Sequence, residues 1–115
     1  MIHIFGIKNC NTVKKALVFL TDNHLEFTFH DFKKEGAPIA QLKSWADQVG
    51  WERLINKKGT TWKKIDPAVQ SSITHEAAAL SILSENTSMI KRPVLAFEGH
   101  LLLGFQEEEY AKLIK

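Results

Sequence analysis

The hydrophobic pattern of the N-terminal third changes its period twice. The apolar segment HIFGI, residues 3–7, is typical of a short strand that is interrupted by a glycine. From Asn11 onward the apolar residues at positions 13, 16, 17 and 20 fall on one face of a helix that ends near Asn23. Residues 25–32, LEFTFHDF, then alternate apolar and polar side chains, which predicts a second strand. This order predicts a βαβ unit.

The C-terminal third predicts a hairpin and a helix. Pro93 precedes the apolar segment VLAF, residues 98–100 form a tight turn, and LLL at 101–103 continues as the partner strand up to Gly104. The tail that follows has three glutamates at 107–109, and acidic residues stabilise the first turn of a helix. The order here is ββα.

Helical patterns occupy the middle of the chain. A helix is predicted after Pro38 and ends at Gly50, and residues 51–55 predict one more helical turn. The segment KKGTTWKK at 57–64 predicts a basic loop. Asp66 before a proline is a good N-cap for a short helix, and Thr74 can cap the next one. These patterns predict an all-helical insertion at about residues 37–88.

The element order βαβ, insertion, ββα predicts an α/β fold with a mixed four-stranded sheet and helices on both of its faces. At 115 residues the chain has the length of one domain, so we expect a single domain over residues 1–115.

Composition narrows the class of protein. Fifteen basic and 13 acidic residues give a formal charge of +2, which is too balanced to predict a nucleic-acid partner. No apolar run approaches the roughly 20 residues of a membrane span, and the N-terminus does not resemble a signal peptide. The single cysteine cannot form an internal disulfide. We therefore expect a cytoplasmic protein with neither a nucleic-acid nor a membrane partner.

That cysteine, Cys10, lies where the first predicted strand passes into the first predicted helix. Unpaired backbone N–H groups at a helix N-terminus stabilise a thiolate, and nearby lysines add to the effect. Lys14 opposes the helix dipole beside this residue, which suggests a functional reason for its presence. The alternative is a buried, unreactive cysteine. The residues expected to stabilise the thiolate or to bind an anion are Lys8, Asn9, Asn11, Thr12 and Lys14.

Other chemistries have no sequence support. The five histidines show no metal-ligand spacing, and no glycine-rich nucleotide-binding pattern occurs. We expect neither a metal nor a nucleotide cofactor.

Several segments, in order along the chain, resemble a known family. They are GIKNCNTVKKA at the start, INKKGTTWKKI at 55–65, IKRP at 90–93 and LLLGF at 101–105. The sequence resembles the ArsC-like thioredoxin-fold proteins, which include arsenate reductases and Spx regulators, and is most similar to their YffB branch of glutathione-dependent thiol reductases. The resemblance implies a thioredoxin-like sheet, Cys10 as the nucleophile, Arg92 as an oxyanion-binding residue and Pro93 as a cis proline.

The sequence departs from the family at two places. Val13 stands where Spx proteins have the second cysteine of a CxxC pair, so an internal redox switch is excluded for these residues. The arsenate reductases use further arginines for the oxyanion, whereas this chain has Asn56, Lys57 and Lys58 near the basic loop.

The resemblance favours a thiol reductase with glutathione as co-substrate. Cys10 would form a mixed disulfide with a small-molecule or protein thiol substrate, and glutathione, with glutaredoxin as a further candidate partner, would resolve it. Arg92, with Lys91 and Lys58 as weaker candidates, would bind a glutathione carboxylate. Two alternatives stay open. One is a noncatalytic Spx-like module that binds RNA polymerase through the basic loop and Trp62, and the other is a glutaredoxin-coupled arsenate reductase.

Overall fold

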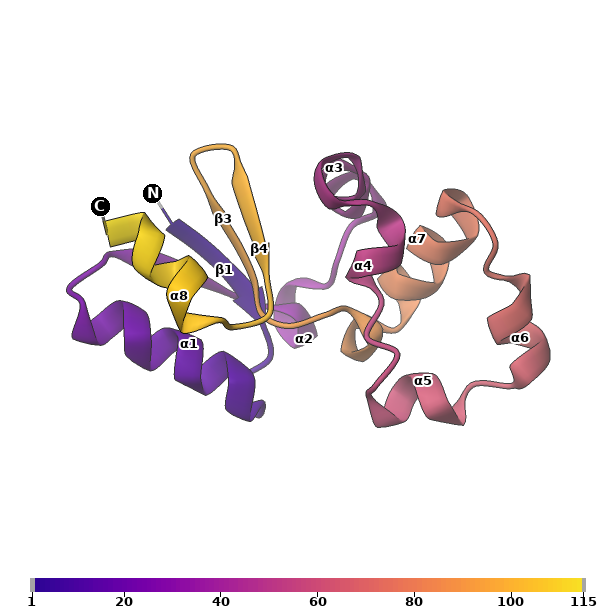
Figure 1. Cartoon of the computed structure of the whole chain (residues 1–115). Helices are drawn as coiled ribbons and strands as arrows, with labels where there is room; N and C mark the ends of the chain where they lie inside the picture. Colours follow the sequence, from indigo (N-terminus) through magenta and orange to yellow (C-terminus); the bar gives the residue numbers. More distant parts are fainter. Residues whose placement is uncertain (1, 115) are drawn as a thin grey trace. The chain divides into compact units, whose positions relative to one another are not determined.

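The computed structural model describes residues 2–114, with side chains described through residue 113. The chain forms four strands and eight α-helices within that range (Figure 1). In chain order they are β1 (Ile2–Gly6), α1 (Asn11–Asp22), β2 (Phe27–Asp31), α2 (Phe32–Glu35), α3 (Ile39–Val49), α4 (Trp51–Leu54), α5 (Thr60–Lys64), α6 (Pro67–Ser72), α7 (Glu76–Glu85), β3 (Val94–Phe97), β4 (His100–Leu103) and α8 (Glu107–Ala111). Short 3₁₀ turns follow α7 (Thr87–Met89) and α8 (Lys112–Ile114).

The chain divides into two compact units. The sheet unit contains the residues up to Glu35 and those from Arg92 onward, and the helical unit contains Gly36–Lys91. The predicted insertion at 37–88 falls inside the helical unit, and the assignment of the chain as one domain stays a prediction. Between residues 2 and 114 no helix combines the length and the apolar character needed to cross a membrane.

The sheet has the strand order β2-β1-β3-β4. Strand β1 pairs in parallel with β2, placing Phe5 beside His30, and antiparallel with β3, placing Phe5 beside Val94. Strands β3 and β4 form an antiparallel hairpin. The predicted mixed four-stranded sheet, βαβ followed by ββα, is therefore confirmed.

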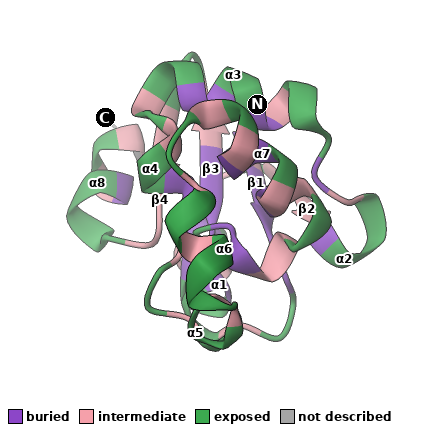
Figure 2. Cartoon of the chain, turned by 90° about the vertical axis from the view of Figure 1, so that its right-hand side faces the viewer, coloured by how far each residue is buried: buried purple, intermediate pink, exposed green. Residues whose placement is uncertain are grey.

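Helices α1 and α8 cover one face of the sheet, and the core of the unit lies between them and the strands. The apolar positions that predicted α1 are the ones that it buries, including Val13 and Leu20. Buried positions concentrate on β1 and β3 (Figure 2). The central cluster consists of Ile2, Ile4, Ala16, Leu20, Leu95 and Tyr110.

The opposite face of the sheet carries the other set of strand side chains. Phe5 stacks on His30, with 4.5 Å between ring centroids, and on Phe32 of α2, with 6.3 Å between centroids. Aromatic contacts therefore attach the short helix α2 to the middle of the sheet.

The helical unit has its own buried residues, among them Leu42 and Trp45 of α3 and Leu80 and Leu83 of α7. The Asp66 cap of α6 is confirmed, because its Oδ1 accepts a hydrogen bond from the Ala68 N–H at 2.8 Å.

Two local predictions in this unit are wrong. The segment 57–64 contains a helical turn, α5, where a loop was expected. Contacts distant in sequence stabilise that turn, since Gln70 Nε2 donates to the Trp62 carbonyl at 2.7 Å and Thr61 Oγ1 lies 3.0 Å from Ser88 Oγ. The cap of α7 is His75 rather than Thr74, because the backbone is still extended at His75.

Candidate active site at the start of the first helix

Cys10 occupies the N-cap position of α1. Its backbone is extended, with φ −140° and ψ 122°, and its carbonyl accepts the first helical hydrogen bond from the Lys14 N–H at 3.0 Å. The side chain is half-buried and therefore accessible to a reactant. The thiol lies at the helix end where unpaired N–H groups concentrate positive potential. The buried-cysteine alternative is inconsistent with this exposure.

Gly6 allows the end of β1 to lie close to α1. A Cβ atom at this position would lie 2.8 Å from Val13 Cγ2, closer than two carbon atoms can approach. A larger residue at position 6 would therefore displace the buried Val13 side chain in the first turn of α1.

The pKa of the Cys10 thiol is lowered from its ordinary value. Partial burial of the sulfur raises the pKa, but hydrogen bonds from the Val13 backbone N–H, the Arg92 side chain and the Thr12 backbone N–H outweigh burial. The positive charge of Arg92 adds a smaller lowering effect. A larger thiolate fraction at neutral pH follows, and the thiolate is the nucleophilic form of cysteine.

Sheet topology explains why Arg92 reaches the thiol although the two residues are far apart in the sequence. Because β3 runs antiparallel to β1, the residues that precede β3 lie at the end of β1 that leads to Cys10. The Arg92–Pro93 peptide bond is cis, as the resemblance implies. The Pro93 carbonyl accepts a hydrogen bond from the Gly104 N–H at 2.8 Å, and the Gly104 carbonyl accepts one from Tyr110 Oη at 3.1 Å. The segment that carries Arg92 is thus attached to the core helix α8.

The remaining predicted site residues divide between the two units. Lys58 and Lys91 are exposed residues of the helical unit, and their backbone N–H groups bond within it, to Asn56 Oδ1 at 3.3 Å and to the Leu54 carbonyl at 2.8 Å. The predicted site residues Lys8, Asn9, Asn11, Thr12 and Lys14 belong to the sheet unit and are exposed. The groups that shift the thiol pKa include the Thr12 backbone but none of the lysines. The assigned roles of these side chains stay predictions.

Sequence reasoning missed the Val13 backbone, the first of the groups that lower the thiol pKa. The Val13 side chain is neither polar nor a second thiol, so it gave no reason to expect a role at the site. Its N–H nevertheless contributes because every residue of a first helical turn except proline has one. The signal that was available is positional: the third residue after an N-cap donates to the cap.

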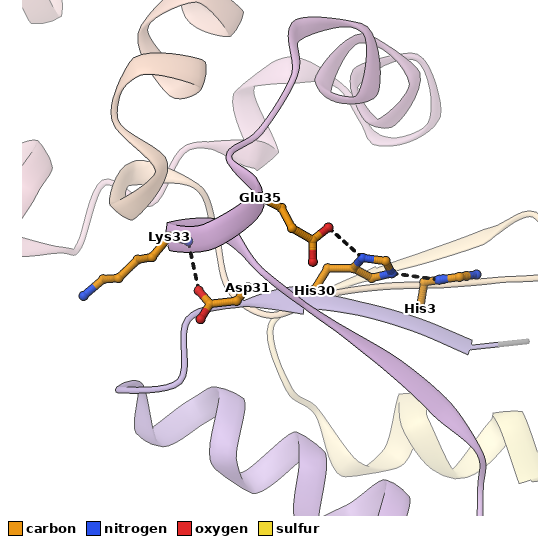
Figure 3. Close-up of polar contacts among 5 residues, drawn as sticks. All are labelled: His3, His30, Asp31, Lys33 and Glu35. Atoms are coloured by element: carbon orange, nitrogen blue, oxygen red, sulfur yellow. Dashed lines mark hydrogen bonds and ion pairs between the residues drawn. The ribbon is translucent and has the colours of Figure 1, made fainter.

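Sequence reasoning also missed a chain of polar contacts on the sheet (Figure 3). His3 Nδ1 lies 2.9 Å from His30 Nε2, and His30 Nδ1 lies 2.9 Å from Glu35 Oε1. When Glu35 is ionised, it accepts the His30 Nδ1–H, so His30 Nε2 accepts from His3 or, in the imidazolium form, donates to it. The Asp31 carboxylate accepts from the Lys33 N–H at 2.9 Å, beside these contacts. Together these contacts link α2 to β2 and, through His30, to β1.

Metal-binding geometry is missing from the part of the chain that the structure describes. Within residues 2–114 no three histidine, cysteine, aspartate or glutamate side chains gather as a cation site would require.

The geometry places a thiol with a lowered pKa beside an arginine, at the end of a strand in a mixed sheet. Family comparison agrees with this arrangement, because the ArsC family matches residues 5–113. The chain belongs to the ArsC family. It is 44% identical over 110 residues to an uncharacterized protein of Haemophilus influenzae, with 96% of each chain covered.

Solved structures of similar proteins share the whole fold. The YffB protein superposes with a TM-score of 0.94 and 36% identity over 100% of both chains. An arsenate reductase (ArsC) related protein from Brucella melitensis gives a TM-score of 0.78 with 41% identity, over 99% of this chain and 94% of the other. These likenesses confirm that this ArsC-family chain is similar to the YffB protein.

Two likenesses are more distant. The global transcriptional regulator Spx of Staphylococcus haemolyticus is 22% identical over 99% of this chain and 87% of its own length. A glutaredoxin from Archaeoglobus fulgidus, 18% identical, shares the fold alone with a TM-score of 0.50, over 99% of this chain and 85% of its own. The fold is thus thioredoxin-like, as expected. Binding of this chain to RNA polymerase stays a prediction.

Proposed function

We propose that this ArsC-family protein is a glutathione-dependent thiol reductase in which Cys10 is the nucleophile. The observation that carries the proposal is the lowered pKa of an accessible thiol, caused by two backbone N–H groups and the Arg92 side chain. A structural cysteine has no need of a hydrogen-bonded anionic form. Such a thiol attacks disulfide sulfur at neutral pH, and the single-cysteine sequence leaves resolution to an external thiol.

The reaction balances as two thiol–disulfide exchanges. The Cys10 thiolate attacks the glutathione sulfur of a mixed disulfide R–S–S–G, the S–S bond breaks, and R–S⁻ leaves and takes up a proton. A second glutathione, as thiolate, attacks the glutathione sulfur bound to Cys10, which releases oxidised glutathione and regenerates the Cys10 thiolate. Overall, R–S–S–G and one glutathione thiol give R–SH and oxidised glutathione, so the substrate cysteine is reduced and one glutathione thiol is oxidised.

Arg92 has two roles in this proposal. In the free protein its hydrogen bond stabilises the Cys10 thiolate. Once the sulfur is in a neutral disulfide, the guanidinium is available for a glutathione carboxylate, which arginine binds in a bidentate geometry. Lys91 and Lys58 are proposed as further carboxylate ligands, with Lys8 and Lys14 beside the thiol. Glutathione is abundant in the reducing cytoplasm, where we place the protein.

Mass spectrometry after exposure to oxidised glutathione tests the nucleophile. We expect one glutathione adduct on Cys10, no adduct on the C10S variant, and release of the adduct by reduced glutathione. Turnover is then measured as NADPH oxidation in the presence of glutathione reductase and a small glutathione mixed disulfide. An unmodified wild-type chain, or an adduct that glutathione does not release, would falsify the proposal.

Arsenate reduction is the second candidate, favoured by the Brucella relative, whose name relates it to arsenate reductase, and by the Arg92–Cys10 hydrogen bond. The same sulfur would attack arsenate, and glutathione with glutaredoxin would supply the electrons. The discriminating measurement is arsenate-dependent NADPH oxidation in the glutaredoxin-coupled system. Consumption that needs both arsenate and Cys10 supports this candidate, and consumption with mixed disulfides alone supports the first.

A further inference from the structure

A groove of about 400 Å³ runs along the outer side of α1. Its helical wall carries Lys14, Lys15, Val18, Phe19 and Asp22. The side chain of Val18 is 57% exposed, the largest exposure among the large hydrophobic residues that the structure describes as exposed. Val18 and Phe19 therefore give the helical wall an apolar middle between charged residues.

The second wall comes from the segment that leads into α8 and contains Phe105 and Glu107. Phe105 packs against Phe19, with 5.9 Å between ring centroids, and against Tyr110, with 4.8 Å between centroids. Tyr110 is 1% exposed, so the floor of the groove rests on the core of the sheet unit. The groove consequently belongs to one unit, because both of its walls come from the sheet unit. Figure 1 shows α1 and α8, the helices that carry or follow these walls, on the same side of the sheet.

Charge along the groove is ordered relative to the thiol. Lys14 lies one helical turn after Cys10, with Lys15 beside it, Val18 follows one turn later, and Asp22 ends the helix. On the helical wall the end near the thiol is therefore basic, the middle is apolar and the far end is acidic, and Glu107 adds an acidic residue on the second wall. A molecule that extends from the Cys10 sulfur along α1 contacts the basic, apolar and acidic regions in that order. An extended peptide can contact all three regions, whereas a small symmetric ligand cannot.

The rise per residue of an α-helix gives the distance of each of these residues from Cys10 along the helix axis. At 1.5 Å per residue, Lys14, Val18 and Asp22 lie about 6, 12 and 18 Å along α1 from Cys10. An extended peptide advances about 3.3 Å per residue. A peptide whose cysteine lies beside the Cys10 sulfur, as the leaving cysteine does in the first exchange, thus brings roughly its second residue to the lysines, its fourth to Val18 and its fifth or sixth to the acidic end.

We propose that this groove binds a protein segment next to a glutathionylated cysteine, with an acidic residue about two positions from that cysteine, an apolar residue about four away and a basic residue beyond it. The inference rests on the proposed thiol reductase function and names its substrate class, protein–glutathione mixed disulfides. In the first exchange the substrate cysteine is the leaving sulfur, so its flanking residues lie beside Cys10 when the S–S bond breaks.

Two glutathionylated peptides of equal composition test the charge order. One is Cys-Ser-Glu-Ser-Leu-Lys, the other has the glutamate and lysine exchanged, and the small mixed disulfide of glutathione with mercaptoethanol serves as reference. We expect kcat/KM for the first peptide to exceed that for the second by about fivefold at low ionic strength, and the ratio to fall toward one as salt screens the charges.

Substitutions in the groove should change the ratio of peptide to reference kcat/KM. K15E should invert the preference between the peptides, and V18D should lower the ratio for both by about fivefold, because a carboxylate replaces the apolar contact. The matched controls are K33E on α2 and V69D on α6, which make the same changes at exposed positions outside the groove. Both should keep the wild-type ratios.

The outcomes separate the two proposals. Equal kcat/KM for both peptides together with turnover of the reference would overturn the groove assignment and leave the reductase intact. No turnover of the reference would overturn the reductase. Binding of the reduced peptides to the C10S variant, followed by fluorescence anisotropy, then tests the groove alone, and equal affinity for both overturns it. A dimer in sedimentation that V18D dissociates would assign the groove to a second copy and would also overturn the proposal.

Discussion

Cys10 and Tyr110 are two ionisable residues of the sheet unit whose pKa values are shifted in opposite directions. The pKa of the Cys10 thiol is lowered, and the pKa of the Tyr110 phenol is raised. Burial raises the pKa at both sites, since it disfavours an anion. At Tyr110 burial dominates, the neighbouring Glu109 charge adds to it, and the pKa of the phenol rises well above its usual range. At Cys10 hydrogen-bond donors outweigh burial.

The difference lies in which groups face the ionisable atom. The Tyr110 hydroxyl donates to the Gly104 carbonyl at 3.1 Å, and such a contact is available only to the neutral form. The Cys10 sulfur instead faces backbone N–H groups at a helix start and a guanidinium, all of which are donors. Burial alone therefore does not decide whether a site in this unit is neutral or anionic.

Arg92 should have the largest effect, because its removal makes the Cys10 site resemble the Tyr110 site. In R92A the thiolate loses a side-chain hydrogen bond and a nearby positive charge, so the pKa of Cys10 should rise. The rate of iodoacetamide alkylation at neutral pH should fall roughly tenfold. Thiolate absorbance against pH measures the pKa directly, since Cys10 is the only cysteine in the sequence.

R53A is the matched control for this prediction, since it removes the other arginine of the sequence, an exposed residue of the helical unit. Its thiol titration should coincide with that of the wild type. If R92A also titrates like the wild type, the guanidinium has no part in stabilising the thiolate, and the comparison with Tyr110 loses its main cause.

Ionisation of Tyr110 should have an effect of intermediate size, and it should change the stability of the protein rather than the reactivity of the thiol. Because its pKa is raised in the folded state, its contribution to stability is present below the unfolded pKa and is lost as pH rises above it. From about pH 10 to about pH 11 the free energy of unfolding should fall by about 1 kcal/mol from this group. Urea unfolding at each pH measures the loss, and tyrosinate absorbance follows the group alone, since it is the only tyrosine in the sequence.

Y110F is the comparison that isolates this effect. It removes the ionisable group, so the part of the alkaline destabilisation that belongs to Tyr110 should disappear. At neutral pH the variant should be less stable by about 1 kcal/mol, because the Gly104 carbonyl loses its hydrogen bond. Identical alkaline slopes for wild type and Y110F would show that the tyrosine ionises without a penalty.

The sequence allowed the sheet and the position of the thiol to be predicted because both depend on local patterns. Alternating and helical periods defined β1, α1 and the hairpin, and Cys10 fell on the boundary between two of them. Turns that depend on distant partners were predicted incorrectly. The helical turn α5 is stabilised by Gln70 and Ser88, which no local pattern connects with residues 60–64.

The electrostatics of the site were predicted only in outline. A basic environment was expected from lysines adjacent in sequence, whereas the groups that lower the thiol pKa are backbone donors and one arginine about eighty residues away. The antiparallel pairing of β1 and β3 brings that arginine to the thiol, and sequence spacing carries no record of strand pairing. The resemblance supplied Arg92 as a candidate, while the topology supplies the physical reason.

The smallest effect should come from removing one backbone donor. Proline lacks an N–H and is tolerated in the first turn of a helix, so T12P removes one of the donors that lower the Cys10 pKa. We expect the thiol pKa to rise by less than it does in R92A, and the alkylation rate at neutral pH to fall about threefold. N11P, one residue earlier, is the control, because the Asn11 N–H is not among the groups that lower this pKa. Its cap residue already has the extended backbone that precedes proline. Equal shifts in T12P and N11P would mean that the helix end acts as a diffuse dipole, whereas a shift in T12P alone would mean that individual N–H groups directed at the sulfur separate Cys10 from Tyr110.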